Sequence, residues 1–132
     1  PMSAAHALYP QTWALQTPDR AALIVVSSGR IVSHYGLDAR SNQLAQLLHA
    51  AGLRRGNHVA MFVDNCLEFF DVVVACSRSG LYLTAVNRYL PASEAAWIVD
   101  DCDARALVVS GALAESEELG RLSGRCEVKL AV

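Results

Sequence analysis

The sequence predicts an α/β domain in which a largely parallel, open sheet carries helices on both faces and is preceded by a β-hairpin. From His58 to Leu130, short apolar runs that suit buried strands alternate with segments of helical period. Apolar residues make up 53% of the 132 residues and charged residues 18%, which is typical of one core-forming domain. Strands that alternate with helices pair in parallel through right-handed crossovers.

The predicted hairpin comes first along the chain. Ala22–Val26 and Ile31–Tyr35 are short runs rich in β-branched residues. The four residues between them, Ser27 to Arg30, include Gly29 and form a turn. We therefore expect two antiparallel strands ahead of the parallel sheet.

A helix is predicted over Leu37–Ala51, because its leucines recur at helical spacing and its polar residues fall on the other faces. Gly52 supplies a left-handed residue that ends this helix. The run His58–Val63 follows a Gly-Asn turn and is almost wholly apolar. Such a run is typical of a strand that is buried on both faces.

The next helix is predicted from Leu67 to Arg78. Asn65 and Glu68 have the spacing of a capping box at its start, and Gly80 ends it. Leu81–Val86 then forms the second strand of the parallel sheet.

The remaining elements repeat the alternation. Pro91 opens a helix that runs towards Asp101, because its missing N–H costs nothing at that position. Ala106–Val109 is a strand, and Ser110 caps a helix over about 112–122. Cys126–Leu130 is the last predicted strand.

Composition excludes several classes of protein. The net charge is −2, from 11 basic and 13 acidic residues, so no basic surplus favours nucleic acid. No apolar run approaches the roughly 20 residues of a membrane-spanning helix. The cysteines are too widely spaced for a zinc site or a disulfide scaffold, and the histidines are scattered, so we expect no metal site. These features predict a soluble, cytoplasmic domain with reduced thiols; the cysteines are Cys66, Cys76, Cys102 and Cys126.

Three common catalytic or nucleotide-binding motifs are absent. The turn after the first parallel strand reads Asp64-Asn65-Cys66 and lacks glycine, so neither a dinucleotide fingerprint nor a P-loop is present. No G-x-S-x-G elbow offers a hydrolase nucleophile. The single lysine, Lys129, does not suit a phosphate-accepting receiver domain. Asp64 stands at a strand end, where we expect it to begin a turn or a cap.

Asn87 and Arg88 are the candidate substrate-binding residues. They follow a predicted strand directly, and open α/β sheets bind ligands at the carboxyl ends of their strands. An arginine that is solvated or paired for structural reasons fits the pattern equally well. No catalytic residue and no metal ligand is assigned in this chain.

Three stretches in series carry a resemblance to a known family. In order and spacing, from Thr17 to Ser110, they resemble the adenylate-forming (AMP-binding) enzymes, and the third resembles their acyl-CoA synthetase branch in particular. Departures occur at scaffold positions, where a family Glu is missing beside Gly36, Asn57 replaces Asp and Ala85 replaces Pro. The stretches are Ser33–Asn42 leading to Gly52–Val59, Asn65–Phe70 leading to Ser79–Tyr82, and Asn87–Glu94 with Ile98–Cys102 and Ala106–Ser110.

The resemblance implies the N-terminal portion of a fatty-acid–CoA ligase. Such an enzyme adenylates a carboxylic acid with ATP and Mg²⁺ and transfers the acyl group to CoA. Residues 1–16 would then be an N-terminal arm and residues 17–132 an α/β subdomain. The family's phosphate loop and its catalytic lysine are absent here, together with the C-terminal domain, so this chain alone is expected to be inactive and to hold no cofactor.

Several partners and alternatives follow from the same resemblance. The expected partners are the remainder of the same chain, a fatty acid, ATP and CoA, and a homo-oligomer is a further expectation. Nucleic acid and a transmembrane segment are not expected. An amino-acid or aryl-acid adenylation domain is an alternative within the family, and a stand-alone flavodoxin-like binding module is an alternative outside it.

Overall fold

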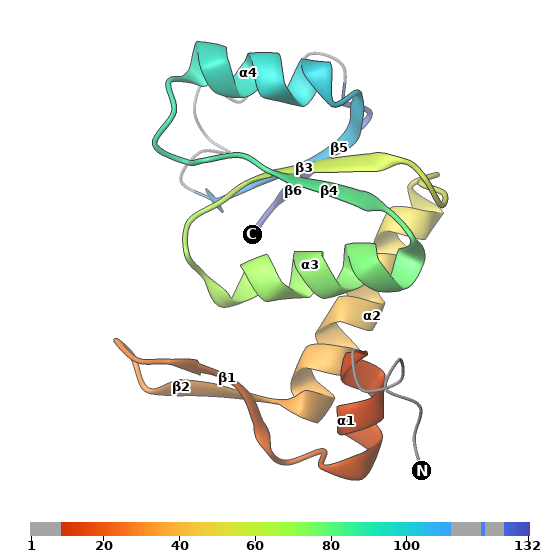
Figure 1. Ribbon diagram of the computed structural model, residues 1–132, viewed down its shortest axis with the longest axis vertical. Coiled ribbons are helices and arrows are strands. Elements are labelled where there is room, and N and C mark those ends of the chain that lie inside the picture. The colour runs from red at the N-terminus through yellow and green to blue at the C-terminus, as the bar shows by residue number, and fades with distance from the viewer. Residues whose placement is uncertain (1–8, 112–119, 121–125) are drawn as a thin grey trace.

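The computed structural model describes residues 9–111, 120 and 126–132. A four-stranded parallel sheet crosses its upper half, with one helix above the sheet and another below it (Figure 1). A long helix, a short helix and a two-stranded hairpin form the lower half. Within the described residues, no helix is both long enough and apolar enough to cross a bilayer.

The strands of the sheet are β3 (His58–Phe62), β4 (Tyr82–Ala85), β5 (Ala104–Val109) and β6 (Val128–Ala131). Their order is β4-β3-β5-β6, and every neighbouring pair is parallel. The predicted parallel sheet is therefore confirmed, and its strand ends differ from the predicted ones by no more than two residues.

Helices cover both faces of the sheet, as the alternation predicted. α3 (Leu67–Ser79) packs on the face that presents Val59 and Met61 of β3. α4 (Ala92–Asp101) packs on the opposite face, which presents Ala60 and Phe62. Successive residues of β3 thus enter two different cores, which explains why this strand is apolar throughout.

α2 (His34–Ala50) and α1 (Pro10–Gln16) lie beside each other at the lower right of Figure 1. α1 lies within residues 1–16, which were expected to form an arm without a helix. α2 begins three residues before its predicted start, because Ser33 caps it by accepting the N–H of Gly36 at 3.1 Å. The predicted extension of the second hairpin strand to Tyr35 is therefore wrong.

β1 (Ala21–Val25) and β2 (Arg30–Ser33) form the predicted antiparallel hairpin as a separate two-stranded sheet. The buried face of the hairpin packs on the first turns of α2 and α3 through Val32, Leu37 and Leu67. The hairpin thus holds both helices where they lie side by side.

The start of α3 differs from the prediction. Cys66, with extended backbone angles (φ −130°, ψ 170°), is the residue before the helix, and its side chain makes no capping hydrogen bond. The predicted capping box between Asn65 and Glu68 is therefore wrong, because Asn65 lies one residue before the position that could cap α3. At the other end, Gly80 is left-handed (φ 65°), as predicted. The helix predicted over 112–122, with its cap by Ser110, lies mostly outside the described residues.

Candidate functional site at the carboxyl edge of the sheet

The carboxyl ends of the parallel strands meet at one edge of the sheet. From β3 the chain crosses to β4 on one side and then, through α4, to β5 on the other side of β3. This reversal creates a topological switch point, the place where open α/β sheets bind ligands. The segments that follow the strands there are 63–65 after β3, 86–89 after β4 and 110–111 after β5.

A hollow of about 440 Å³ opens at this edge. It lies over the ends of β3 and β4, on the β4 side of the switch point. Asn87 and Arg88, the two candidate residues predicted from the sequence, line it together with Asp64 and Asn65 of the predicted turn. Its lining consists of Val63, Asp64, Asn65, Phe69, Ala85, Val86, Asn87, Arg88 and Tyr89.

Arg88 forms an ion pair with Asp64 across the hollow. Both side chains are 43% exposed, so solvent screens the pair and its contribution to stability is small. The guanidinium carbon of Arg88 also lies 5.2 Å from the centre of the Tyr89 ring, within cation–π range. Because the Asp64 carboxylate is half-exposed, an anionic ligand is able to displace it from the Arg88 guanidinium.

Asn87 holds the turn that presents Arg88. Its Oδ1 accepts the backbone N–H of Tyr89 at 3.0 Å, and its carbonyl accepts the N–H of Leu90 at 3.1 Å. The oxygen of the Asn87 amide is therefore committed to the loop, while its NH₂ group remains able to donate.

Ser110 also belongs to this edge, although its sequence context predicted only a helix cap. Its side chain is buried, and its Oγ accepts the N–H of Asp64 at 2.8 Å. Its own N–H donates to the carbonyl of Phe62. The sequence offers one signal for this role of Ser110: it is a polar residue that directly follows a strand of buried apolar residues.

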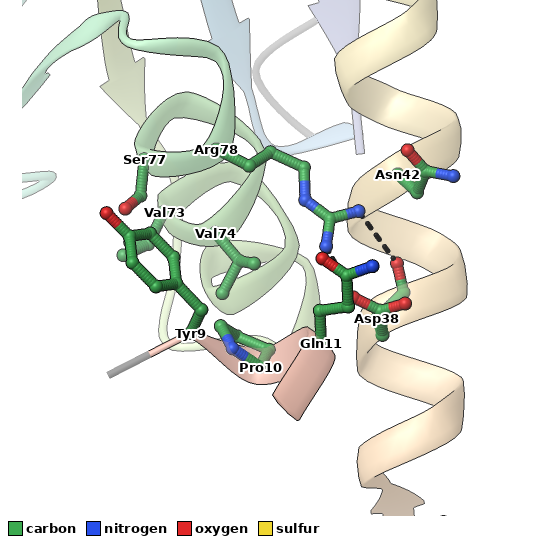
Figure 2. A pocket seen from close by; sticks show the side chains of 9 residues that line it. All are labelled: Tyr9, Pro10, Gln11, Asp38, Asn42, Val73, Val74, Ser77 and Arg78. Carbon is green, nitrogen blue, oxygen red and sulfur yellow. Dashed lines mark hydrogen bonds and ion pairs between the residues drawn. The ribbon is translucent and has the colours of Figure 1, made fainter. Parts of the chain in front are cut away.

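A second hollow, of about 410 Å³, lies between α1, α2 and α3. Figure 2 shows Arg78 of α3 reaching towards Asp38 of α2, with Gln11 of α1 nearby. Arg78 pairs with the Asp38 carboxylate, and its Nη1 donates to the Asp38 carbonyl at 3.3 Å. Because these charges neutralise each other across two helices, we assign them to helix packing.

A second charged cluster joins the same two helices. Arg40 donates to Asp71 from Nε at 2.9 Å and from Nη2 at 2.5 Å, and it also reaches Glu68. Burial raises the pKa of Asp71, and Arg40 offsets part of that rise. A hydrogen bond from its own backbone N–H, with further ones from Cys66 and Arg40, lowers the pKa of Glu68.

The thiols have the properties of structural cysteines. Burial raises the pKa of Cys76 to about 12 and also raises the pKa values of Cys66 and Cys126. All four cysteines are free. Among the described residues, no group of three or more His, Cys, Asp or Glu side chains could hold a metal ion.

Comparison with known proteins identifies the family. The family model described as "AMP-binding enzyme" matches residues 10–131, nearly the whole chain. This chain belongs to the AMP-binding enzyme family.

Curated relatives of this AMP-binding protein are CoA ligases. The crotonobetaine/carnitine–CoA ligase of Proteus mirabilis (strain HI4320) is 35% identical to it over 94 residues. That alignment covers 69% of this chain but 18% of the relative. The chain therefore spans less than a fifth of the length of the ligase that it matches.

Solved structures of CoA ligases share its fold. A protein from Rhodopseudomonas palustris CGA009, described as a long-chain-fatty-acid CoA ligase, superimposes with a TM-score of 0.84 at 25% identity. The match covers 93% of this AMP-binding chain and 31% of that structure. o-Succinylbenzoate CoA synthetase from Bacillus subtilis, in complex with ATP and magnesium, superimposes with a TM-score of 0.80 at 24% identity. That match covers 92% of this chain and 32% of the synthetase structure.

Proposed function

We propose that the chain is the N-terminal portion of an ATP-dependent acyl-CoA synthetase that activates a fatty acid. The match to crotonobetaine/carnitine–CoA ligases, 35% identical over 94 residues, supports the assignment as an acyl-CoA synthetase. The likeness to a protein described as a long-chain-fatty-acid CoA ligase supports a fatty acid as its substrate. In the reaction, a carboxylate oxygen attacks the α-phosphorus of ATP, which forms an acyl-adenylate and releases pyrophosphate. The CoA thiol then attacks the acyl carbon, and AMP leaves as the thioester forms.

The chain alone is proposed to be inactive. Phosphoryl chemistry needs several cations and backbone donors around the phosphates. This sequence has a single lysine, Lys129, and the described residues hold no cluster of metal ligands. These residues do not fit magnesium, so no step of the reaction is assigned to a metal held by this chain.

The role of the chain in the longer enzyme is that of a scaffold. Its parallel sheet and helices supply one wall of the catalytic domain, and the remainder of the chain packs on that wall and carries the phosphate loop. The carboxyl edge of the sheet is the part of the wall that faces the substrates, because its loops end at the topological switch point. We place this enzyme in the cytoplasm.

Arg88 and Asn87 are the residues proposed to contact a substrate. Arg88 offers the only arginine side chain in the lining of the edge hollow, and Asn87 offers the donors of its amide. An anionic group, carboxylate or phosphate, would take the place of Asp64 beside the guanidinium. Asp64 thus keeps Arg88 extended before the substrate arrives.

The experiment that tests the function is an assay of pyrophosphate release and of CoA thioester formation. It uses the longest reading frame that contains this sequence, a panel of fatty, amino and aryl acids, and the 132-residue chain as the control. We expect release that depends on a fatty acid in the longer protein and none in the control. Release with amino or aryl acids alone would favour the corresponding adenylation domain. A reading frame that stops at Val132, with no activity, would favour a flavodoxin-like binding module.

A further inference from the structure

The two charges of the edge hollow neutralise each other. Among the described residues that line it, Asp64 is the one acid and Arg88 is the one base. Their side chains form an ion pair, and the described residues offer the Asp64 carboxylate no other partner. An anion that enters the hollow therefore meets a guanidinium whose charge is already compensated. The compensating carboxylate belongs to the same chain, so its effective concentration beside Arg88 is high.

The Asp64 carboxylate is able to leave Arg88 without a change in the backbone. The N–H of Asp64 donates to the buried Oγ of Ser110 at 2.8 Å, which fixes the backbone at the end of β3. The Asp64 side chain is 43% exposed, and rotation about its torsions between staggered rotamers takes the carboxylate into solvent. The exchange of Asp64 for a ligand is therefore a movement of one side chain and requires no opening of a loop.

Asp64 is not the only group that holds Arg88 in place. Oδ1 of Asn87 accepts the N–H of Tyr89 at 3.0 Å and fixes the turn that carries Arg88. The guanidinium carbon of Arg88 also lies 5.2 Å from the centre of the Tyr89 ring. Loss of the Asp64 charge should therefore leave the guanidinium in the hollow, where it is able to bind an anion.

We propose that Asp64 is an internal competitor of the anionic ligand, because its carboxylate occupies Arg88 while the hollow is empty and must leave when an anion binds. This proposal rests on the role proposed above for Arg88. A half-exposed pair is weak enough to be displaced, yet every anion must first overcome it. After its displacement the Asp64 carboxylate stays near the ligand and repels it. Asp64 thus weakens the binding of anions at this edge of the sheet.

The test titrates the 132-residue chain with inorganic pyrophosphate and follows the backbone amides and the Nε–H of Arg88 by NMR. In wild type, the chemical shifts that change should centre on Arg88 and Tyr89. Asp64→Asn keeps the backbone N–H that donates to Ser110 and removes the competing charge. Its dissociation constant for pyrophosphate should be lower by roughly three- to tenfold, because an exposed ion pair and a nearby like charge each change affinity by a small factor.

Two further variants control for charge and for the location of binding. Asp100→Asn removes the same charge from an exposed residue near the end of α4, on the far side of that helix from the hollow's loop at 86–89. This control should change the dissociation constant by no more than about twofold, because salt screens distant surface charges. Arg88→Ala should abolish the binding of pyrophosphate, since it removes the one cation of the lining.

The proposal is overturned if Asp64→Asn binds pyrophosphate no more tightly than wild type, or if Asp100→Asn tightens binding equally. Binding that depends on Arg88 without a gain in Asp64→Asn would overturn this proposal alone. An absence of binding in both wild type and Asp64→Asn, or its persistence in Arg88→Ala, would overturn the proposed role of Arg88 as well. None of these outcomes depends on enzymatic activity, so they are distinct from a failure of the proposed reaction.

Discussion

The backbone N–H of Asp64 donates to Oγ of Ser110 at 2.8 Å and thereby ties the end of β3 to the end of β5. The two residues are far apart in the sequence, but parallel pairing of their strands brings them to one edge of the sheet. Because Ser110 is buried, water cannot easily replace its hydroxyl as the acceptor. This bond therefore sets the relative position of the loops that carry the candidate site.

Replacing Ser110 with alanine should lower the free energy of unfolding by about 1–2 kcal/mol, because the Asp64 N–H loses its acceptor. Urea denaturation followed by circular dichroism measures this change. Ser28→Ala is the control, since the Ser28 hydroxyl accepts the N–H of Arg30 at 3.4 Å in an exposed turn. The control should change stability by no more than about 0.5 kcal/mol. Equal losses in the two variants would contradict a special role for the buried bond.

Replacing Arg88 with alanine should separate stability from binding. The Asp64–Arg88 pair is 43% exposed on both sides, so the free energy of unfolding should fall by less than about 1 kcal/mol. In the longer ligase, the same change should raise the KM for the anionic substrate that Arg88 contacts. The matched control is Arg55→Ala, on an exposed loop at the opposite edge of the sheet. Unchanged kinetics in both half-reactions would remove Arg88 from the site.

The parallel sheet could be predicted from the sequence because its strands and helices differ in hydrophobic period. His58–Val63 is apolar throughout, and the structure explains this by placing helices on both faces of β3. The carboxyl edge was also predictable, since strand order and direction bring Asn87 and Arg88 there. These predictions used only the local pattern and the rule for parallel connections.

What could not be predicted depends on contacts between distant segments. The Asp64–Arg88 pair and the Asp64–Ser110 bond join residues of different strand ends, and no local pattern indicates them. The start of α2 at His34 was missed because β-branched residues run up to Ser33, whose side chain then caps the helix. α1 was missed because a helix of 7 residues is too short for a clear hydrophobic period.

Asp71 should give the folded protein a pH dependence of defined sign. Burial raises its pKa above the ordinary value of 3.8, so in the range just above pH 3.8 the folded state holds a proton that the unfolded state has released. Its contribution to stability is therefore full below pH 3.8 and is lost as the pH rises through the folded pKa. The difference in unfolding free energy between wild type and Asp71→Asn, measured from pH 3 to about 7, should shift against wild type across this range. A shift in favour of the wild type would mean that Arg40 lowers the pKa of Asp71 by more than burial raises it.

The four thiols should react in two classes. Cys66 and Cys102 are half-buried, whereas Cys76 and Cys126 are buried. Burial raises the pKa of Cys76 to about 12, so almost no thiolate exists there near neutral pH. Alkylation with iodoacetamide at pH 8, followed by peptide mass mapping, should label Cys66 and Cys102 first. Cys76 should be labelled only after the chain is unfolded, and early labelling of Cys76 would contradict its place in the core.

Two glycines should respond to alanine in opposite directions. Gly80 ends α3 with φ +65°, and an added Cβ would lie 2.9 Å from Cγ of Arg55. Both the left-handed backbone and this close approach oppose a side chain, so Gly80→Ala should lower the free energy of unfolding by about 1–2 kcal/mol. Gly36 lies in the first turn of α2 with ordinary backbone angles, and an added Cβ would meet its neighbours at 3.4 Å. Because alanine favours a helix over glycine by up to about 1 kcal/mol, Gly36→Ala should leave stability unchanged or raise it. Thermal denaturation of the pair measures both effects; a loss at Gly36 equal to that at Gly80 would show that crowding against Ser33 outweighs helix propensity.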